Sequence, residues 1–497
     1  MRRRIPIFYS ALLLTGVNLL LRMVGTVFQV YISGRIGAAG VGLLQLVLSV
    51  SSLAMVAGIA GVRTATMYLT AEEIGRGRAG SVTWVLSGCF LYSIVCSGFV
   101  GAGLFALAPQ VAASWIGEPN TADALRLVGA FLPLVCLCGV MSGYFTAADR
   151  IGTLALVEIG EQLCSMAVTV LALAFWAGED PSHTCCAVML GSCAGTCLTL
   201  GCLVLLRIRE GGRGGRIPIR CRLLQAALPL AGADVVKAGI NTTENLMVPK
   251  RLARNVRVEN PLAAFGMVSG MVFPVMMFPA CILFGLAELL IPELARCNAA
   301  GSKKRISYLV RRSLRVALLY GVFFGGLMFL AGDDVCQRLY RNAEAGRYLK
   351  LYAPLVPILY CDAITDAMTK GLGQQKICVR YNILTSALDV LFLYFLLPKY
   401  GMMGYYASFL VTHLLNFALS LRRLLRITGE RIPLYIPCYA ASAALLSAWA
   451  ASHLASPVWR CAAFTPLLAS SLYLLGVFGR EDLRWALGLL RRRTVLA

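Results

Sequence analysis

The chain has 497 residues, of which 58% are hydrophobic and 14% are charged, and its formal net charge is +22. Apolar stretches recur throughout, and many reach the roughly 20 residues that a helix needs to cross a bilayer. No polar stretch is long enough to fold as a soluble domain, which excludes a separate catalytic head. The positive charge does not require a nucleic-acid partner, because cytoplasmic loops of membrane proteins collect lysine and arginine and meet anionic lipid.

Sequence motifs for catalysis and metal binding are missing. The chain contains 18 cysteines and 3 histidines, but most cysteines lie in apolar stretches, where they behave as small hydrophobic residues. We find no phosphate-binding G-x-x-x-x-G-K-[ST], no zinc-binding H-E-x-x-H and no nucleophile motif G-x-S-x-G. We therefore expect no metal site, no cofactor and no enzymatic activity.

A first polar stripe lies in residues 11–33, ALLLTGVNLLLRMVGTVFQVYIS. At about 100° per residue, Asn18, Arg22 and Gln29 fall on one face of a helix whose opposite face is apolar. An arginine that faces lipid at mid-span costs on the order of 3 kcal/mol. Arg22 is therefore expected either to line an aqueous path or to pair with a neighbouring helix, and intramembrane ionisable groups favour the functional role.

The same arrangement returns in residues 227–248, ALPLAGADVVKAGINTTENLMV. Asp234, Lys237, Asn241 and Glu244 share one helical face. Two half-chains that each open with such a helix are typical of secondary transporters, in which the substrate path lies between repeated halves.

The apolar pattern predicts fourteen transmembrane helices, because backbone groups in lipid must be hydrogen-bonded within the segment. They are expected at residues 8–33, 41–66, 82–107, 124–148, 153–177, 184–206, 223–248, 262–291, 309–331, 348–371, 377–397, 402–424, 432–452 and 459–478. Prolines within spans, among them Pro133, Pro279 and Pro354, predict kinks. Lysine and arginine are concentrated at both ends and in the even-numbered loops, which predicts a multi-pass cell-membrane protein with cytoplasmic termini.

A sequence repeat relates the two halves of the chain. FLPLV at residues 131–135 matches YAPLV at residues 352–356, and similar polar turns follow the second and eighth spans. The repeat predicts an N-terminal lobe of six spans (1–210), a basic linker (211–222) and a C-terminal lobe of six spans (223–427). Two further spans and a basic tail (428–497) complete the chain.

Other charges lie inside or near the predicted spans. Arg63 is expected either to line the cavity or to reach the cytoplasmic interface. Asp362, Asp366 and Lys370 follow at i, i+4 and i+8, with acid before base, an order that favours ion pairing. Asp362 is expected to pair with one of the two stripe cations or to bind a proton or cation.

Glu158 and Glu161 begin the fifth span, and Asp389 lies within the eleventh. We do not expect Glu161 and Asp389 to be functional residues.

The cations in both stripes indicate the charge of the substrate. Cationic groups at membrane depth favour an anion, because charge-assisted hydrogen bonds to phosphate are strong and arginine makes them in pairs. A lipid-linked diphosphate therefore fits better than a hydrophobic cation, for which a cavity of acidic and aromatic side chains is expected.

Four blocks of the sequence resemble the stage V sporulation protein B group. They are NLLLRMVGTVFQVYISGRIGAAGVGLLQLVLSV, LTAEEIGRGRA, ENLMVPKRL and APLVPILYCDAITDAMTKGLGQQ. These polysaccharide-biosynthesis exporters belong to the multidrug/oligosaccharidyl-lipid/polysaccharide (MOP) flippase superfamily, which includes the lipid II flippases. The resemblance implies an all-α polytopic protein with two six-helix lobes in a V, two C-terminal helices, and alternating access to an undecaprenyl-diphosphate-linked sugar.

The resemblance also bears on individual residues. Arg22 matches an arginine in the first helix of lipid II flippases. Their second arginine falls where this chain has Phe28-Gln29, so Arg63 or Lys237 would have to complete the diphosphate site.

The leading hypothesis is a flippase for a lipid-linked peptidoglycan or polysaccharide precursor. Its expected partners are that lipid, H⁺ or Na⁺ as a coupling ion, membrane lipids and cell-wall synthesis proteins. The alternatives are a cation-coupled multidrug antiporter on the same fold and a non-translocating protein of envelope assembly. The residues expected to bind substrate are Arg22, Lys237, Arg63, Asn18, Gln29 and Asn241. The residues expected to couple ions or pair charges are Glu244, Asp234, Asp362 and Asp366.

Overall fold

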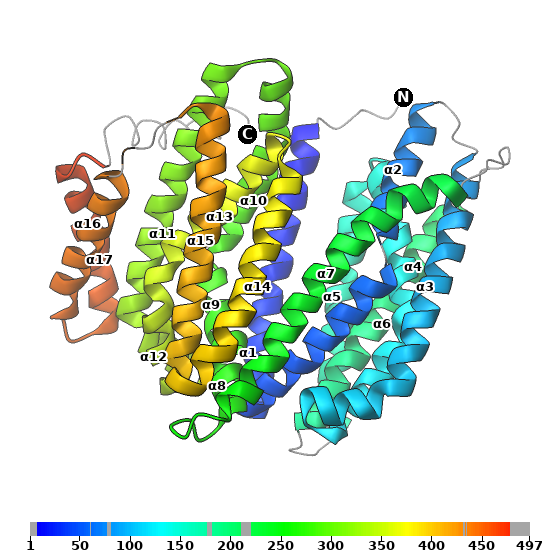
Figure 1. Ribbon diagram of the computed structural model, residues 1–497, viewed down its shortest axis with the longest axis horizontal. Helices are drawn as coiled ribbons and strands as arrows, with labels where there is room; N and C mark the ends of the chain where they lie inside the picture. Colours follow the sequence, from blue (N-terminus) through cyan, green and yellow to red (C-terminus); the bar gives the residue numbers. More distant parts are fainter. Residues whose placement is uncertain are drawn as a thin grey trace. The chain divides into compact units, whose positions relative to one another are not determined.

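The computed structural model describes residues 7–59, 61–76, 81–175, 181–209, 220–430, 433 and 435–477. Every regular element within these residues is helical (Figure 1). The helices are α1 (Ile7–Ile59), α2 (Val62–Gly75), α3 (Val82–Val111), α4 (Ala122–Ala147), α5 (Ile151–Phe175), α6 (Pro181–Ile208), α7 (Arg220–Leu252), α8 (Pro261–Gly266), α9 (Phe273–Met277), α10 (Ala280–Ala299), α11 (Lys303–Tyr340), α12 (Ala343–Tyr352), α13 (Val356–Gly371), α14 (Gln375–Tyr400), α15 (Met402–Thr428), α16 (Tyr435–Ser452) and α17 (Pro457–Leu474). The expectation of an all-α polytopic membrane protein is confirmed.

Several predicted spans are broken or extended in the structure. Within the described residues, seven helices are long and apolar enough to cross a membrane, or eight if Pro261–Met277 and Ala280–Ala299 count as one span. That pair bends by 63° at Pro279, which cannot continue the backbone hydrogen bonding of a helix. The predicted span 348–371 is likewise divided into α12 and α13. Helix α11 extends past both ends of the predicted span 309–331.

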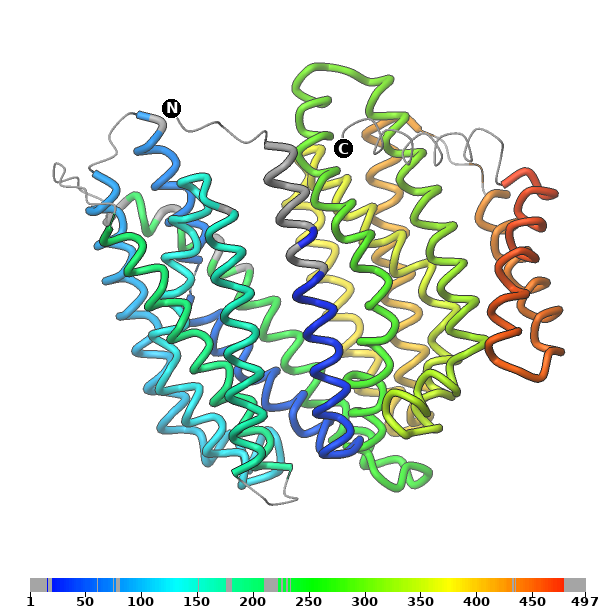
Figure 2. The backbone as a smooth tube through the Cα atoms, turned by 180° about the vertical axis from the view of Figure 1, so that it is seen from behind, coloured from blue at the N-terminus to red at the C-terminus, as the bar shows by residue number. Residues whose placement is uncertain are grey.

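Helix α1 turns sharply at Gly37, where φ is 66° and ψ is −176°. A residue with a Cβ rarely adopts a positive φ. Glycine has no Cβ, so it permits this turn. Residues 7–36 and 38–59 are therefore two helical segments joined by a single residue. Figure 2 shows the chain changing direction between them. The predicted second span, 41–66, corresponds to segment 38–59 followed by α2.

The chain divides into two compact units, Met1–Gly270 with Ser386–Ser408 and Met271–Thr385 with Phe409–Ala497. In the first unit, helices α3–α6 form a bundle (Figure 2). On α6, Gly191 and Gly195 form a G-x-x-x-G motif, which lets two helices approach closely. A Cβ on Gly191 would lie 2.1 Å from Thr169 Oγ1 of α5, and one on Gly195 would lie 2.9 Å from the Glu161 carbonyl oxygen.

Helix α7 packs against α1 and α2 in the same unit. The Thr242 hydroxyl donates to the Ser49 carbonyl at 3.1 Å, and Asn245 Nδ2 donates to Ser49 Oγ at 2.9 Å. At the other end of α7, Arg222 forms an ion pair of 3.1 Å with Glu73, a fully buried residue at the end of α2. These contacts tie one end of α7 to α1 and the other end to α2.

In the second unit, the α16–α17 hairpin packs against α11 (Figure 1). The Phe464 ring of α17 lies directly over Gly326 of α11, where a Cβ would come within 2.2 Å of its Cζ atom. Phe323 stacks on the same ring with centroids 6.3 Å apart, and Ala440 and Ala443 of α16 are fully buried beside it. The division into lobes 1–210 and 223–427 follows the sequence repeat and stays a prediction.

Candidate functional site

The three cations predicted to bind substrate are exposed in the first unit. They are Arg22 on α1, Arg63 on α2 and Lys237 on α7. Arg63 lies close enough to Glu158 of α5 for their charges to interact. The structure thus places these three charges at the surface of the first unit rather than in its packed core.

The other predicted substrate-binding residues differ in their surroundings. Gln29 is half-buried and donates from Nε2 to the Gly270 carbonyl oxygen at 2.9 Å, so its amide is partly committed to packing. Asp234 and Asn241 are exposed on α7, as the predicted stripe requires. The side chain of Asn18 lies outside the described residues.

Glu244 of α7 has an acidic neighbour. Its carboxyl group lies within hydrogen-bonding reach of the carboxyl group of Asp389 on α14. Asp389 is only 6% exposed. The Ser408 hydroxyl of α15 also donates to Asp389 Oδ1. Two carboxylates so close repel each other unless they share a proton or a cation, so this pair is suited to hold one positive charge.

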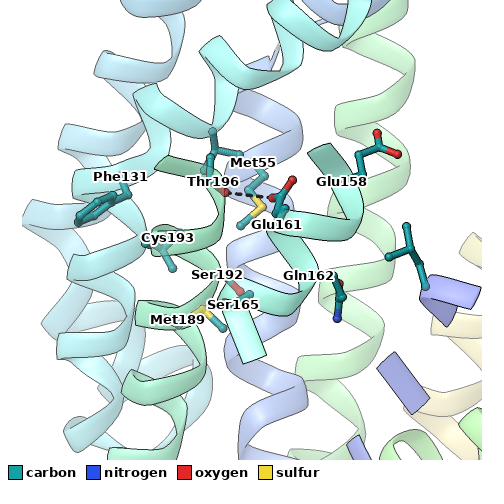
Figure 3. A pocket seen from close by; sticks show the side chains of 13 residues that line it. Met55, Phe131, Glu158, Glu161, Gln162, Ser165, Met189, Ser192, Cys193 and Thr196 are labelled. Carbon is teal, nitrogen blue, oxygen red and sulfur yellow. Dashed lines mark hydrogen bonds between the residues drawn. The ribbon is translucent and has the colours of Figure 1, made fainter. Parts of the chain in front are cut away.

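A polar cavity of about 430 Å³ lies within the first unit (Figure 3). Its walls come from α1, α4, α5 and α6. Glu158, Glu161, Gln162, Ser165, Ser192 and Thr196 supply its polar lining, and Leu21, Met55, Val128, Phe131, Val135, Met189 and Cys193 complete it. Leu21 directly precedes Arg22 in the chain, but Arg22 is not among the residues that line this cavity.

Glu161 is the most constrained acid of the cavity. Thr199 Oγ1 donates to Glu161 Oε2 at 2.9 Å, and Thr196 Oγ1 lies 3.4 Å from Oε1 (Figure 3). Both threonines are on α6, one and two turns from the closely packed Gly191, so the α5–α6 contact orients the carboxylate. Figure 3 shows Glu158 one turn away from Glu161 along α5.

The remaining predicted acids lie in the second unit. Asp362 of α13 accepts two hydrogen bonds from Asn416 Nδ2 of α15, at 3.1 Å to Oδ1 and 2.9 Å to Oδ2. Asp366 forms the expected i,i+4 ion pair with Lys370, at 2.6 Å. Among the described residues, no group of three acidic, cysteine or histidine side chains is placed to hold a metal ion.

The cavity around Glu161 was not anticipated from the sequence, from which Glu161 and Asp389 were not expected to be functional residues. The G-x-x-x-G motif of α6 was the available signal, because it predicts a closely packed partner helix. Thr196 and Thr199 follow that motif and would then have been expected to meet polar groups of the partner.

The chain is similar in sequence and in fold to known transporters and to a sporulation protein. A family model described as MatE matches residues 254–395. The chain is 22% identical over 410 residues to stage V sporulation protein B of Bacillus subtilis (strain 168), covering 80% of this chain and 79% of that protein. Its structure resembles that of the lipid II flippase MurJ in an inward closed conformation. The TM-score is 0.68 at 11% identity, covering 95% of this chain and 99% of the other.

The chain has the fold of the MOP transporters. It also resembles an inward-facing MATE multidrug resistance transporter of this superfamily, with a TM-score of 0.66 at 11% identity over 84% of this chain and all of the other. These relatives are transporters, flippases or sporulation proteins, in agreement with the expectation that the chain is a transporter rather than an enzyme. The sporulation-protein resemblance expected from the sequence blocks is confirmed.

Proposed function

We propose that this MOP-fold protein translocates an undecaprenyl-diphosphate-linked peptidoglycan or polysaccharide precursor by alternating access. The observation that carries the proposal is the exposure of three cations of one unit, Arg22 and Arg63 within the apolar span Leu20–Ile74 and Lys237 on α7. Arginine or lysine facing lipid at mid-span costs on the order of 3 kcal/mol. Three such residues are better explained by an aqueous path that carries an anion.

The diphosphate of the lipid supplies that anion. Arg22 would bind it through paired hydrogen bonds and Lys237 as a point charge. Arg63 and the amides of Asn18, Gln29 and Asn241 would add contacts along the path. Resemblance in fold to a lipid II flippase and in sequence to a sporulation protein supports a cell-envelope precursor as cargo.

The acidic residues near Lys237 would control when the bound diphosphate is released. Glu244 and Asp234 lie on the same helix as Lys237, so a change in their charge alters the field that the anion experiences. Asp362 and Asp366 would pair charges in the second unit. We propose H⁺ or Na⁺ as the coupling ion, a cell-membrane location with cytoplasmic termini, and cell-wall synthesis proteins as partners.

Translocation in proteoliposomes tests this function. A fluorescent lipid-linked diphosphate sugar is reconstituted with the protein, and the fraction reaching the opposite leaflet is measured with a membrane-impermeant quencher. One hydrogen bond to a charged group contributes about 1.5–3 kcal/mol, so Arg22→Ala and Lys237→Ala should each slow translocation by roughly 10- to 150-fold. Lys237→Arg should retain most of the rate.

Arg209→Ala is the matched control, because Arg209 is also an exposed cation but follows the end of α6. It should leave the rate unchanged. If both Arg22→Ala and Lys237→Ala translocate as fast as this control, the two side chains do not bind the diphosphate.

A second candidate function is cation-coupled multidrug export. The acidic cavity around Glu158 and Glu161 favours it, because carboxylates attract cationic compounds and coupling ions. The 25% identity over 209 residues to a probable multidrug resistance protein NorM of Rhizobium meliloti (strain 1021), covering 40% of this chain and 42% of that protein, adds support.

Dye efflux from cells that overproduce the protein separates the two functions. The export hypothesis requires Glu161→Gln to abolish efflux driven by a cation gradient. Asp123→Asn is the control, because its side chain is 77% exposed and pairs only with nearby Arg126 among the contacts described. Absence of efflux in the unmodified protein, together with lipid translocation, would reject the export hypothesis.

A further inference from the structure

Helix α11 has opposite charges at the two ends of its apolar segment. Residues 316–332, VALLYGVFFGGLMFLAG, are uncharged, and at about 1.5 Å per residue they span roughly the hydrocarbon thickness of a bilayer. Arg311, Arg312 and Arg315 precede this segment, and Asp333 and Asp334 follow it. The three arginines therefore lie at one membrane boundary, at the level of lipid headgroups.

Helix α15 brings three more arginines to that boundary. It ends in LRRLLRIT, which contains Arg422, Arg423 and Arg426. An ion pair between Arg311 and Glu430, just beyond the end of α15, joins the two helix ends. The arginines of α11 and α15 thus gather at the same face of the second unit, although more than a hundred residues separate them in the chain.

We call Arg311, Arg312, Arg315, Arg422, Arg423 and Arg426 the arginine cluster. Arg423 is oriented by a 2.6 Å hydrogen bond from Nη2 to Gln374 Oε1 in the turn before α14. Arg422 and Arg426 are exposed. The positive charges of these two arginines lie at the depth of the lipid phosphates.

The residue type indicates the ligand. Orientation of a membrane protein requires only positive charge in its loops, and lysine would serve as well as arginine. All six members are arginine, whose planar guanidinium group binds phosphate oxygens in pairs. Basic sites between helices at a membrane boundary recognise anionic lipid headgroups.

We propose that the arginine cluster binds the phosphodiester headgroup of an anionic phospholipid from the surrounding leaflet. The bound lipid bridges the ends of α11 and α15 through hydrogen bonds to their arginines. This site lies in the second unit, whereas the cargo-binding residues proposed above, Arg22, Arg63 and Lys237, belong to the first, so the two proposals fail or succeed independently.

Native mass spectrometry and lipid-dependent thermal unfolding of the full-length protein test the site. The probes are cardiolipin, phosphatidylglycerol and, as a zwitterionic reference, phosphatidylcholine. The two anionic lipids should bind and raise the unfolding temperature, and phosphatidylcholine should not. A variant with Arg312→Gln, Arg315→Gln, Arg422→Gln and Arg426→Gln should bind cardiolipin at least tenfold more weakly.

The matched control is Lys303→Gln with Lys304→Gln, since these exposed lysines begin the same helix but lie further from its apolar segment. It should bind cardiolipin like the unmodified protein. A double variant, Arg422→Gln with Arg426→Gln, changes only exposed side chains and reports on the site if the quadruple variant does not fold.

Two results would overturn the proposal. One is equal binding of cardiolipin by the arginine variants and the lysine control, which would reduce the effect to general surface charge. The other is displacement of cardiolipin by soluble inorganic diphosphate at comparable concentration, which would assign the cluster to free phosphate rather than to a lipid.

Discussion

Replacing Gly191 with alanine is predicted to separate α5 from α6. A Cβ at this residue would lie 2.1 Å from Thr169 Oγ1 and 2.4 Å from the Ser165 carbonyl oxygen. The threonine hydroxyl can rotate away, but the carbonyl belongs to the backbone of α5. Because ordinary contact begins at 3.4 Å, the helices must move apart by roughly 1 Å, and overpacking of this kind costs about 1–3 kcal/mol.

The same separation should loosen the cavity, because the threonines that hold Glu161 lie on α6 just beyond Gly191. The assay is the fraction of purified protein that stays monodisperse on size exclusion after heating. Gly201→Ala is the control on the same helix, since nothing lies within 4 Å of its added Cβ. We expect a lower midpoint temperature for Gly191→Ala and an unchanged one for Gly201→Ala. Equal midpoints would refute close α5–α6 packing.

Two further predictions concern ion pairs near the helix ends. Arg222→Ala should destabilise the protein by about 1–3 kcal/mol in a thermal unfolding assay, because it removes a hydrogen-bond partner from the fully buried Glu73; no change would mean that water or another residue already compensates. Hydrogen bonds from Ser307 and Arg311 lower the pKa of the Glu430 carboxyl, so their stabilisation is present at neutral pH and is lost as pH falls through the lowered pKa. Between about pH 6 and about pH 3 the unfolding temperature should therefore fall more for the unmodified protein than for Glu430→Gln, and parallel decreases would contradict this account.

The sequence predicted those features that depend on local periodicity. The exposed stripe of Asp234, Lys237 and Asn241 follows from helical spacing alone, and so does the Asp366–Lys370 pair. Both need only the geometry of one helix. The exposure of Arg22 could likewise be anticipated, because its apolar neighbours fix the opposite face.

Features that depend on contacts between distant helices were harder to predict. Glu161 and Asp389 were not expected to be functional residues. Their surroundings come from other elements: Thr199 of α6 orients Glu161, and Glu244 of α7 faces Asp389. The bend at Pro279 was also only partly predictable. A proline predicts that a helix bends, but the 63° angle depends on the surrounding helices.

The turn at Gly37 has a mechanical consequence for the first unit. Segments 7–36 and 38–59 of α1 meet at one residue, so no slack separates the segment that carries Arg22 from the one that holds α7 through Ser49. Gly37 therefore fixes where the two segments meet, while the absence of a Cβ lets the angle between them change. It can serve as a hinge between the first cationic stripe and the segment that holds the second.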